Sequence, residues 1–308
     1  MKILVTGGAG FIGAHLCRTL LDRGDQVVCL DNFATSSKQG IEALFDYPDF
    51  SLVEADVCDP PDLDEDLDAV AHLACPASPP EYLRMPLETL AIGSRGSENV
   101  LEAARHSSAR VLLASTSEVY GDPQEHPQRE SYWGNVNPIG PRSVYDESKR
   151  YAEALFSAHR RTLDANTGIV RIFNTYGPGL RPHDGRAVSN FIAQALANEP
   201  ITIYGDGTQT RSFCYVSDLV AGLVKMIDSN QPGPINLGNP NETTLVELAS
   251  LILEITGSSS TIVHQPLPID DPRVRRPDIT LARDLLDWSP TVSLEEGIRR
   301  TIEWQMSL

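Results

Sequence analysis

The sequence predicts an α/β fold: a doubly wound, mostly parallel sheet with a smaller C-terminal lobe. Three observations support this prediction. Strand-like and helix-like segments alternate through the first half of the 308-residue chain, and such alternation implies right-handed crossovers between parallel strands. A glycine-rich turn follows the first strand-like segment, and the second half changes to short elements separated by turns. The length suits one large domain, or a large domain with an added lobe.

The individual elements follow from hydrophobic periodicity. We predict strands at 2–6, 26–30, 50–54, 68–73, 110–114 and 168–172. Helices are predicted at 11–23, 86–106 and 145–161, and in the second half at 187–197, 217–228, 244–255 and 294–306. We therefore predict a sheet-forming domain over 1–175 and a smaller lobe over 176–308, with a diffuse boundary and some chain crossing back.

Composition excludes several classes of protein. Hydrophobic residues make up 41% of the chain and charged residues 22%, which is enough apolar material for a core. No run of about 18 apolar residues occurs, so we expect no membrane-spanning helix. The formal net charge of −17 would repel a phosphate backbone, which argues against nucleic-acid binding. The five cysteines form no C-x-x-C pair, as expected of reduced thiols in a cytoplasmic protein without a metal site.

The turn between the first strand and the first helix predicts a dinucleotide site. Gly7, Gly10 and Gly13 occur with G-x-x-G-x-x-G spacing. Glycine permits a tight turn and a close approach of backbone to a pyrophosphate, and the following helix offers unpaired N–H groups and partial positive charge. Phe11 and Ile12 lie within this motif and are expected to contact the same cofactor. The sheet is therefore expected to be of the Rossmann type.

Acidic residues after the next strands indicate which cofactor binds. Asp31 ends the second strand, where a carboxylate can bind a ribose diol and would repel a 2′-phosphate, so NAD is favoured over NADP. Asp56 and Val57 follow the third strand and are expected to face the adenine, with a plain surface loop as the alternative. Asn32 and Leu73, at the ends of the second and fourth strands, complete the predicted cofactor contacts.

Tyr145 and Lys149 form a Y-x-x-x-K pair on a predicted helix, where positions i and i+4 share a face. A lysine ammonium and an oxidised nicotinamide both favour a phenolate, so we expect the pKa of Tyr145 to fall from about 10 toward neutrality. Tyr145 could then act as a general base on a sugar hydroxyl. The spacing alone also arises by chance, so its weight depends on the neighbouring strand.

That strand, at 110–114, ends in polar side chains. Sites of doubly wound sheets lie beyond the carboxyl ends of the strands. Thr116 could hydrogen-bond the same hydroxyl as Tyr145, and Glu118 brings a carboxylate to the site. The alternative is a strand-end cap or turn, in which serine and threonine are common. Together with the nucleotide motif, these residues favour a catalytic site.

Longer stretches resemble the extended short-chain dehydrogenase/reductase family over nearly the whole chain. The glycine motif and the Y-x-x-x-K pair are typical of the superfamily. Three stretches resemble its UDP-glucuronate decarboxylases in particular: Pro-Ala-Ser-Pro-Pro at 76–80, Thr-Ser-Glu at 116–118 and DDPRVRRPDI at 270–279.

The resemblance implies a carboxy-lyase that converts UDP-glucuronate to UDP-xylose with tightly bound NAD. Tyr145, assisted by Thr116 and Lys149, would remove the C4 hydroxyl proton while hydride passes to NAD⁺. The resulting 4-keto sugar would lose CO₂, and Tyr145 and Thr116 would stabilise the enolate. Protonation at C5 and return of the hydride complete the cycle. Glu118 and Arg275 match the family's additional catalytic pair, expected to orient the carboxylate and to manage water or proton delivery at C5.

The resemblance also implies contacts with the nucleotide sugar. Arg186 and Arg211 would face the diphosphate, and Ile203 and Tyr204 would lie near the uracil. The remaining expected contacts are Tyr82, Ser117, Asn174, Gln209 and Arg275. Members of the family pair through two long helices, so a homodimer is expected.

Three alternatives remain open. A UDP-glucuronate 4-epimerase would share the oxidation, but such enzymes usually lack a carboxylate at the position of Glu118. A nucleotide-sugar 4,6-dehydratase typically has Asp-Glu after the threonine, and Ser117 replaces that aspartate. A protein that merely binds NAD would not need the phenol of Tyr145.

Two residues depart from the family pattern. Gly93 stands in the predicted helix at 86–106, where many relatives have asparagine. Because a helical glycine costs about 1 kcal/mol relative to alanine, we expect a close approach of the backbone to the sheet. Cys75 replaces a serine, and no chemistry is assigned to it.

Overall fold

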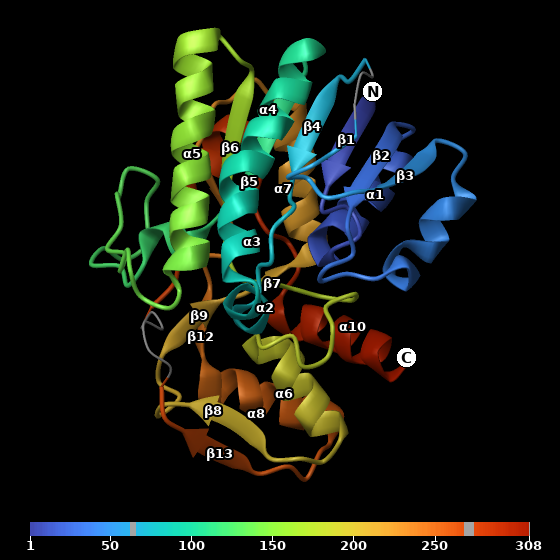
Figure 1. The fold of residues 1–308 in the computed structure, drawn as a ribbon. Coiled ribbons are helices and arrows are strands. Elements are labelled where there is room, and N and C mark those ends of the chain that lie inside the picture. Colours follow the sequence, from blue (N-terminus) through green and yellow to red (C-terminus); the bar gives the residue numbers. More distant parts are fainter. Residues whose placement is uncertain (62–65, 268–273, 308) are drawn as a thin grey trace.

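The computed structural model describes residues 1–61, 66–267 and 274–307. Seven strands form the central sheet in the order β11-β6-β5-β4-β1-β2-β3 (Figure 1). Every pairing in this sheet is parallel. The strands are β1 (Lys2–Thr6), β2 (Gln26–Asp31), β3 (Phe50–Glu54), β4 (Ala69–His72), β5 (Arg110–Thr116), β6 (Thr167–Ile172) and β11 (Ile235–Leu237). The strand order reverses between β1 and β4, so the doubly wound fold is confirmed.

Helices cover both faces of the sheet (Figure 1). One face packs against α1 (Phe11–Asp22), α7 (Val216–Asp228) and α9 (Thr280–Leu286). The other face packs against α4 (Ser97–His106) and α5 (Ser143–Leu163). Because both faces are buried, the strands are nearly continuous apolar runs, which is why they could be predicted from the sequence.

The C-terminal lobe has its own core. Its helices are α6 (Ala187–Leu196), α8 (Leu245–Thr256) and α10 (Leu294–Met306). Its short strands are β7 (Thr175–Tyr176), β8 (Ile201–Tyr204), β9 (Thr210–Ser212), β10 (Cys214–Tyr215), β12 (Glu242–Thr244) and β13 (Ile262–Gln265). Helix α7 and strand β11 return from the second half of the sequence to the main sheet, so the two halves interleave.

The segment predicted as one helix at 86–106 has three parts. Helix α3 (Pro86–Ala91) passes through a π-helical turn, η2 (Ile92–Gly96), into α4. A Cβ atom at Gly93 would lie 2.6 Å from Cβ of Ser148 on α5. The expected close approach therefore exists, but its partner is helix α5 and not the sheet. Short elements such as α2 (Pro79–Arg84) and the 3₁₀ helix η1 (Lys38–Asp46) were not predicted.

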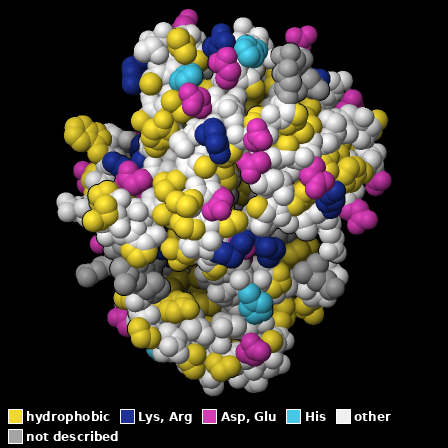
Figure 2. Space-filling view, viewed as in Figure 1, with side chains coloured by type: hydrophobic (Ala, Val, Ile, Leu, Met, Phe, Trp, Pro, Cys, Tyr) yellow, Lys and Arg dark blue, Asp and Glu magenta, His cyan; other side chains and the backbone are white. Residues whose placement is uncertain are grey.

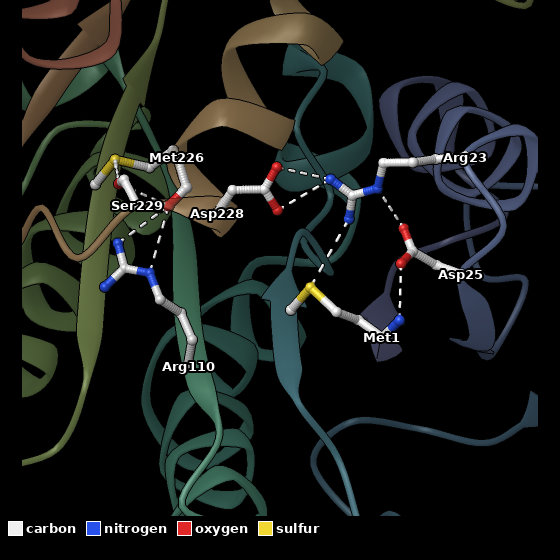
Figure 3. Close-up of polar contacts among 7 residues, drawn as sticks. All are labelled: Met1, Arg23, Asp25, Arg110, Met226, Asp228 and Ser229. Atoms are coloured by element: carbon white, nitrogen blue, oxygen red, sulfur yellow. Dashed lines mark hydrogen bonds and ion pairs between the residues drawn. The ribbon is translucent and has the colours of Figure 1, made fainter.

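An ionic network joins elements at the amino ends of the strands (Figure 3). Asp25 accepts hydrogen bonds from the Met1 amine at 2.9 Å and from Nε of Arg23 at 2.6 Å. The other side of the Arg23 guanidinium pairs with Asp228 at the end of α7, at 2.7 Å. Arg110 lies nearby and donates from its guanidinium to a main-chain carbonyl at the end of α7. The network thus ties the first strand to α1 and α7.

No helix among the described residues combines the length and the apolar character needed to cross a membrane.

Candidate active site

A cavity of about 1010 Å³ lies between the carboxyl ends of the strands and the C-terminal lobe. Its walls come from the segments that follow β1, β2, β4 and β5 and from α6, β8 and β9 of the lobe. This is the position at which doubly wound sheets bind ligands. The volume lies at the upper end of the range of small-molecule sites, as expected for two ligands in one cleft.

The glycine motif is shaped for close contact with a dinucleotide. Gly7 has φ of +69°, a conformation that L side chains rarely adopt, and leads the chain from β1 toward α1. A Cβ atom at Gly13 would lie 2.1 Å from the carbonyl oxygen of Gly7. The turn and the helix can therefore stay in contact only because residue 13 lacks a side chain. The first turn of α1 then faces the cavity, where a pyrophosphate fits.

Asp31 links the glycine motif to the next loop. Its carboxylate accepts hydrogen bonds from the backbone of Ala9 at 3.0 Å and of Phe33 at 2.8 Å, and from the hydroxyl of Ser36 at 2.8 Å. Asp31 also lines the cavity, so its carboxylate could accept hydrogen bonds from a ribose diol in addition to these donors or in place of them. Asn32 donates to Asp56 at 2.9 Å, which joins the loops after β2 and β3.

All residues predicted to bind the cofactor line this one cavity. They are Gly7, Gly10, Phe11, Ile12, Gly13, Asp31, Asn32, Asp56, Val57, Leu73, Tyr145 and Lys149. A bound NAD requires these residues to line one cavity. The fold brings them together although Gly7 and Lys149 are far apart in the sequence.

Tyr145, Lys149 and Thr116 meet at the end of β5. Lys149 donates from Nζ to the carbonyl of Ala114 at 2.9 Å, and this places its ammonium 5.9 Å from the centre of the Tyr145 ring. Burial raises the pKa of Tyr145 in the protein alone, and the Thr116 hydroxyl beside the phenol lowers it only in part. In the protein without cofactor, desolvation outweighs the neighbouring groups, so the expected fall toward neutrality, which includes the charge of an oxidised nicotinamide, stays a prediction.

Glu118 lies in the 3₁₀ helix η3 (Ser117–Tyr120), directly after β5, between two arginines. Arg275 binds both of its carboxylate oxygens, at 2.7 and 2.8 Å. Arg142 donates to Oε2 at 2.9 Å. Burial alone would raise the pKa of Glu118, but Arg275 and Arg142 lower it to about 2. Glu118 is thus a fixed carboxylate at neutral pH and cannot by itself supply a proton.

Two buried polar atoms whose charge states Glu118 influences have no hydrogen-bond partner among the described residues. One is the hydroxyl of Tyr82, whose ring stacks on that of Tyr145 with centroids 5.2 Å apart. The other is Oδ1 of Asp146, in the first turn of α5. Burial, and then the charge of Glu118, raise the pKa of Asp146 to about 7. The attraction of a helix N-terminus for an anion, about 0.3–1 kcal/mol, is too small to offset burial of a charge.

Five buried side chains have an atom without a hydrogen-bond partner among the described residues. They are Tyr82, Asp146, Asp184, Ser212 and Arg276. Oδ1 of Asp184 nevertheless pairs with Nε of Arg186 at 3.1 Å, and of the five side chains only Tyr82 and Asp184 line the cavity. Because buried polar groups normally have partners, the Tyr82 hydroxyl is a position where a polar ligand could bind.

The residues predicted for the nucleotide sugar surround the same cavity, with one exception. Lining residues include Tyr82, Ser117, Asn174, Arg186, Tyr204, Gln209, Arg211 and Arg275. Ile203 is fully buried in the core of the lobe, and its side chain does not line the cavity. The prediction for the Ile203 side chain is wrong because side chains alternate along β8, so that Thr202 and Tyr204 face the cavity instead.

Two charged residues in or beside the site were missed from the sequence. Arg142 immediately precedes α5, lines the cavity and pairs with Glu118, whereas Asp146 follows Tyr145 without lining the cavity. Both stand within four residues of the Y-x-x-x-K pair. Charged residues at the start of the predicted helix are a signal that could have identified Arg142 and Asp146. Periodicity alone, however, does not show which side of this turn faces the protein interior.

A model of the family described as "NAD dependent epimerase/dehydratase family" matches residues 3–238. UDP-glucuronic acid decarboxylase 1 of Arabidopsis thaliana is 51% identical over 302 residues, which is 98% of this chain and 69% of the relative. UDP-glucuronic acid decarboxylase 1 of Danio rerio is 50% identical over 98% of this chain and 72% of its own length.

A solved structure extends the comparison. The UDP-glucuronic acid 4-epimerase of Bacillus cereus, in complex with UDP-glucuronic acid and NAD, superimposes with a TM-score of 0.90 at 31% identity, over 100% of this chain and 99% of that one. The family model, the relatives that match 98% of this chain and the shared fold all agree with an NAD-binding site in the cavity. The chain belongs to the NAD dependent epimerase/dehydratase family, and within it groups with the UDP-glucuronic acid decarboxylases.

Proposed function

We propose that this protein is an NAD-dependent carboxy-lyase that converts UDP-glucuronate to UDP-xylose and CO₂. The observation that carries the proposal is the carboxylate of Glu118, held by two arginines beside Tyr145 and Thr116 at the end of β5. Relatives that share half of its residues bear the name UDP-glucuronic acid decarboxylase.

Tyr145, Thr116 and Lys149 are proposed to handle the proton of the C4 hydroxyl. Bound NAD supplies the reversible oxidation of the sugar at that carbon. Tyr145 accepts the hydroxyl proton, Thr116 hydrogen-bonds the same oxygen, and Lys149 adds positive charge beside the phenol. When CO₂ leaves, negative charge develops on the C4 oxygen, and the Tyr145 and Thr116 hydroxyls can donate hydrogen bonds to it.

Arg275 is proposed to bind the carboxylate of the substrate. It already makes a bidentate contact with the carboxylate of Glu118, so its guanidinium is oriented for that geometry. When the substrate takes up part of this contact, Arg142 still holds Glu118. Glu118 then remains beside C5, where it can orient water or the sugar, while the carboxylate that leaves is bound by Arg275.

The lobe is proposed to hold the nucleotide. Arg186 precedes α6 and Arg211 lies on β9, and both line the cavity as cations for the diphosphate. Thr202 and Tyr204 line the wall that β8 forms, on the side where the uracil is expected. The division into an NAD-binding domain and a nucleotide-sugar lobe is part of this proposal, with α7 and β11 assigned to the first.

The test is incubation of the purified protein with UDP-glucuronate and chromatography of the products. We expect UDP-xylose and an equivalent amount of CO₂, without net consumption of NAD. The second candidate is UDP-glucuronate 4-epimerisation, because the epimerase of Bacillus cereus shares the fold at 31% identity. UDP-galacturonate without CO₂ would establish that function and overturn the decarboxylase.

We also propose a homodimer that forms through the face of α3 and α5. Figure 2 shows hydrophobic side chains gathered over these helices. Leu87 on α3 is 76% exposed and Tyr151 on α5 is 53% exposed. Light scattering should give twice the mass of the chain for the protein and for Leu285→Glu, a control on α9 outside this face, and a single mass for Leu87→Glu with Tyr151→Glu. A dimeric double variant would overturn this interface.

The cysteines support a cytoplasmic setting for this enzyme. All five are free, and three of them are buried. Free, buried thiols are typical of proteins that work in a reducing compartment.

A further inference from the structure

Arg275 reaches the site from a segment without regular secondary structure. Residues 274–279 precede α9 and lie outside the named helices and strands. Arg275 is nonetheless buried, and its guanidinium contacts Glu118 at 2.7 Å and Asn174 at 3.4 Å. Sites on irregular segments are less precise than sites on helices and strands, unless neighbouring groups fix the backbone. The position of Arg275 therefore depends on what its own backbone contacts.

Gln128 contacts the backbone beside Arg275. Its main chain donates to the carbonyl of Arg276 at 2.9 Å and accepts from the N–H of Asp278 at 2.8 Å, as part of an isolated parallel bridge. Its side-chain Oε1 accepts a third hydrogen bond, at 2.8 Å, from the N–H of Arg276. That N–H belongs to the peptide group that joins Arg275 to Arg276. The side chain of Gln128 therefore fixes the peptide plane next to Arg275.

The Gln128 side chain is itself held in place. Gln128 is 1% exposed, and its Nε2 donates to the carbonyl of Glu125 at 2.8 Å. One end of the amide thus binds the segment of Arg275, and the other end binds the loop that precedes Gln128. Because a buried polar group without a partner is costly, the amide has little freedom to turn away from the Arg276 N–H.

A buried asparagine connects Gln128 to the element that carries Glu118. Asn236 on β11 donates from Nδ2 to the carbonyls of Gln128 and Asp278, both at 3.0 Å. Its Oδ1 accepts a hydrogen bond from the hydroxyl of Tyr120 at 2.8 Å. Tyr120 ends η3, the short helix in which Glu118 lies. One buried network therefore positions both the carboxylate and the arginine segment of the ion pair.

We propose that Gln128 is a positioning residue, which holds the Arg275 guanidinium where the carboxylate of the substrate binds. This inference rests on the proposed function, in which Arg275 binds that carboxylate. Gln128 does not line the cavity, so it acts on the substrate only through the segment of Arg275. Without its side-chain hydrogen bond, the peptide between Arg275 and Arg276 can turn, and the guanidinium no longer has a single position. The loss should therefore affect ligands that have a carboxylate and spare ligands that lack one.

The experiment compares the binding of UDP-glucuronate with that of UDP-glucose, which has the same diphosphate but no carboxylate. The NAD-loaded Tyr145→Phe protein serves as the parent, so that neither ligand is turned over. Calorimetric titration of Gln128→Met in this parent should give a dissociation constant for UDP-glucuronate that is about tenfold higher, the loss expected for one hydrogen bond. The dissociation constant for UDP-glucose should not change.

Two further variants separate positioning from a general loss of structure. Gln194→Met removes a comparable contact in the lobe, where the amide of Gln194 accepts from the N–H of Thr202 at 3.0 Å and donates to its hydroxyl at 3.1 Å. This control should leave the ratio of the two dissociation constants unchanged. In an Arg275→Met background, Gln128→Met should not change that ratio further, because the group that it positions is gone.

An unchanged ratio in Gln128→Met would overturn the inference, as would equal losses of affinity for both ligands. If Gln128→Met does not fold, Gln128→Asn provides the same test, because its shorter side chain cannot reach the Arg276 N–H from the same backbone position. A loss that persists in full in the Arg275→Met background would assign the effect to another group and overturn the inference as well.

The products separate this failure from that of the proposed function. If the unchanged protein forms UDP-xylose and the ratio in Gln128→Met stays that of the parent, only the role of Gln128 is removed. UDP-galacturonate as the product of the unchanged protein would instead remove the decarboxylase.

Discussion

The two ends of the sheet carry ionic clusters of similar composition but different completeness. At the amino ends of the strands, Asp25 is shared by the Met1 amine and Arg23, and Arg23 also binds Asp228 (Figure 3). Among the described side chains, every buried polar atom without a partner lies elsewhere. At the carboxyl ends, Glu118 is fully engaged but Tyr82 and Asp146 each keep an orphaned oxygen.

The complete cluster at the amino ends is interpreted as stabilising the fold, and the incomplete cluster at the carboxyl ends as part of a ligand-binding site. A complete cluster contributes to stability, and loss of one member leaves a partner unpaired. An incomplete cluster costs stability, and is explained when a substrate completes it. Substitutions at the amino ends of the strands should therefore lower the free energy of unfolding. Substitutions at the carboxyl ends should lower the rate of turnover.

The largest effect is expected from Tyr145→Phe. Loss of the hydroxyl removes the group proposed to accept the C4 proton, so formation of UDP-xylose should fall by about 10³-fold or more. The thermal midpoint should change little, because the ring still stacks on Tyr82. Tyr47→Phe, which loses a hydroxyl contact with Asp22 far from the cavity, is the control and should keep full activity. Near-normal turnover in Tyr145→Phe would exclude the proposed general base.

Glu118→Gln should have the next largest effect. The amide keeps the shape but removes the charge between Arg142 and Arg275, so turnover should fall by roughly 10²-fold. Affinity for UDP should stay close to that of the unchanged protein, because the arginines of the lobe are the ones proposed to bind the diphosphate. Stopped-flow rates and UDP titrations measure the two quantities. An unchanged rate would remove Glu118 from the mechanism.

Asp25→Asn tests the opposite end of the sheet. The carboxylate accepts two charged hydrogen bonds in a mostly buried position, so the free energy of unfolding should fall by roughly 1–3 kcal/mol. Activity at a temperature well below the transition should not change. Urea unfolding of this variant is compared with that of Glu295→Gln, which breaks an exposed pair on α10 and should have little effect. If Asp25→Asn loses activity but not stability, the contrast between the two ends fails.

A pH-dependent gain of stability is expected in Asp146→Asn. The pKa of Asp146 rises on folding, from 3.8 to about 7. Its contribution to stability is thus fully present below the unfolded pKa and is lost as the pH rises through the folded value. The variant should consequently melt at a higher temperature than the unchanged protein near pH 8, with the difference shrinking toward pH 5. A difference that does not depend on pH would indicate a packing effect instead.

Local patterns predicted most of the fold. Buried parallel strands have continuous apolar sequences, and the long amphipathic helices have a clear period, so their positions agree closely with the structure. Strand β11 was not predicted, because three residues carry no period, and its place beside β6 depends on a long excursion of the chain. The short helix α2 and the π-helical turn were missed for the same reason.

The candidate site was predictable where its signal is local. The glycine motif and the Y-x-x-x-K pair each occupy a few consecutive residues. The contact between Glu118 and Arg275 spans 157 positions, so no spacing rule could find it, and only the resemblance to a family pointed to Arg275. Arg142 and Asp146 were missed because their role depends on which side of the first turn of α5 faces inward.

Gly93 controls where the catalytic helix can lie. The backbone of η2 approaches Ser148 so closely that even a methyl group would meet it at 2.6 Å, one residue before Lys149. Any larger residue at 93 would push α5 outward and carry the phenol of Tyr145 away from Thr116. The missing Cβ atom of Gly93 thus helps to set the distance between the Tyr145 phenol on α5 and Thr116 at the end of β5.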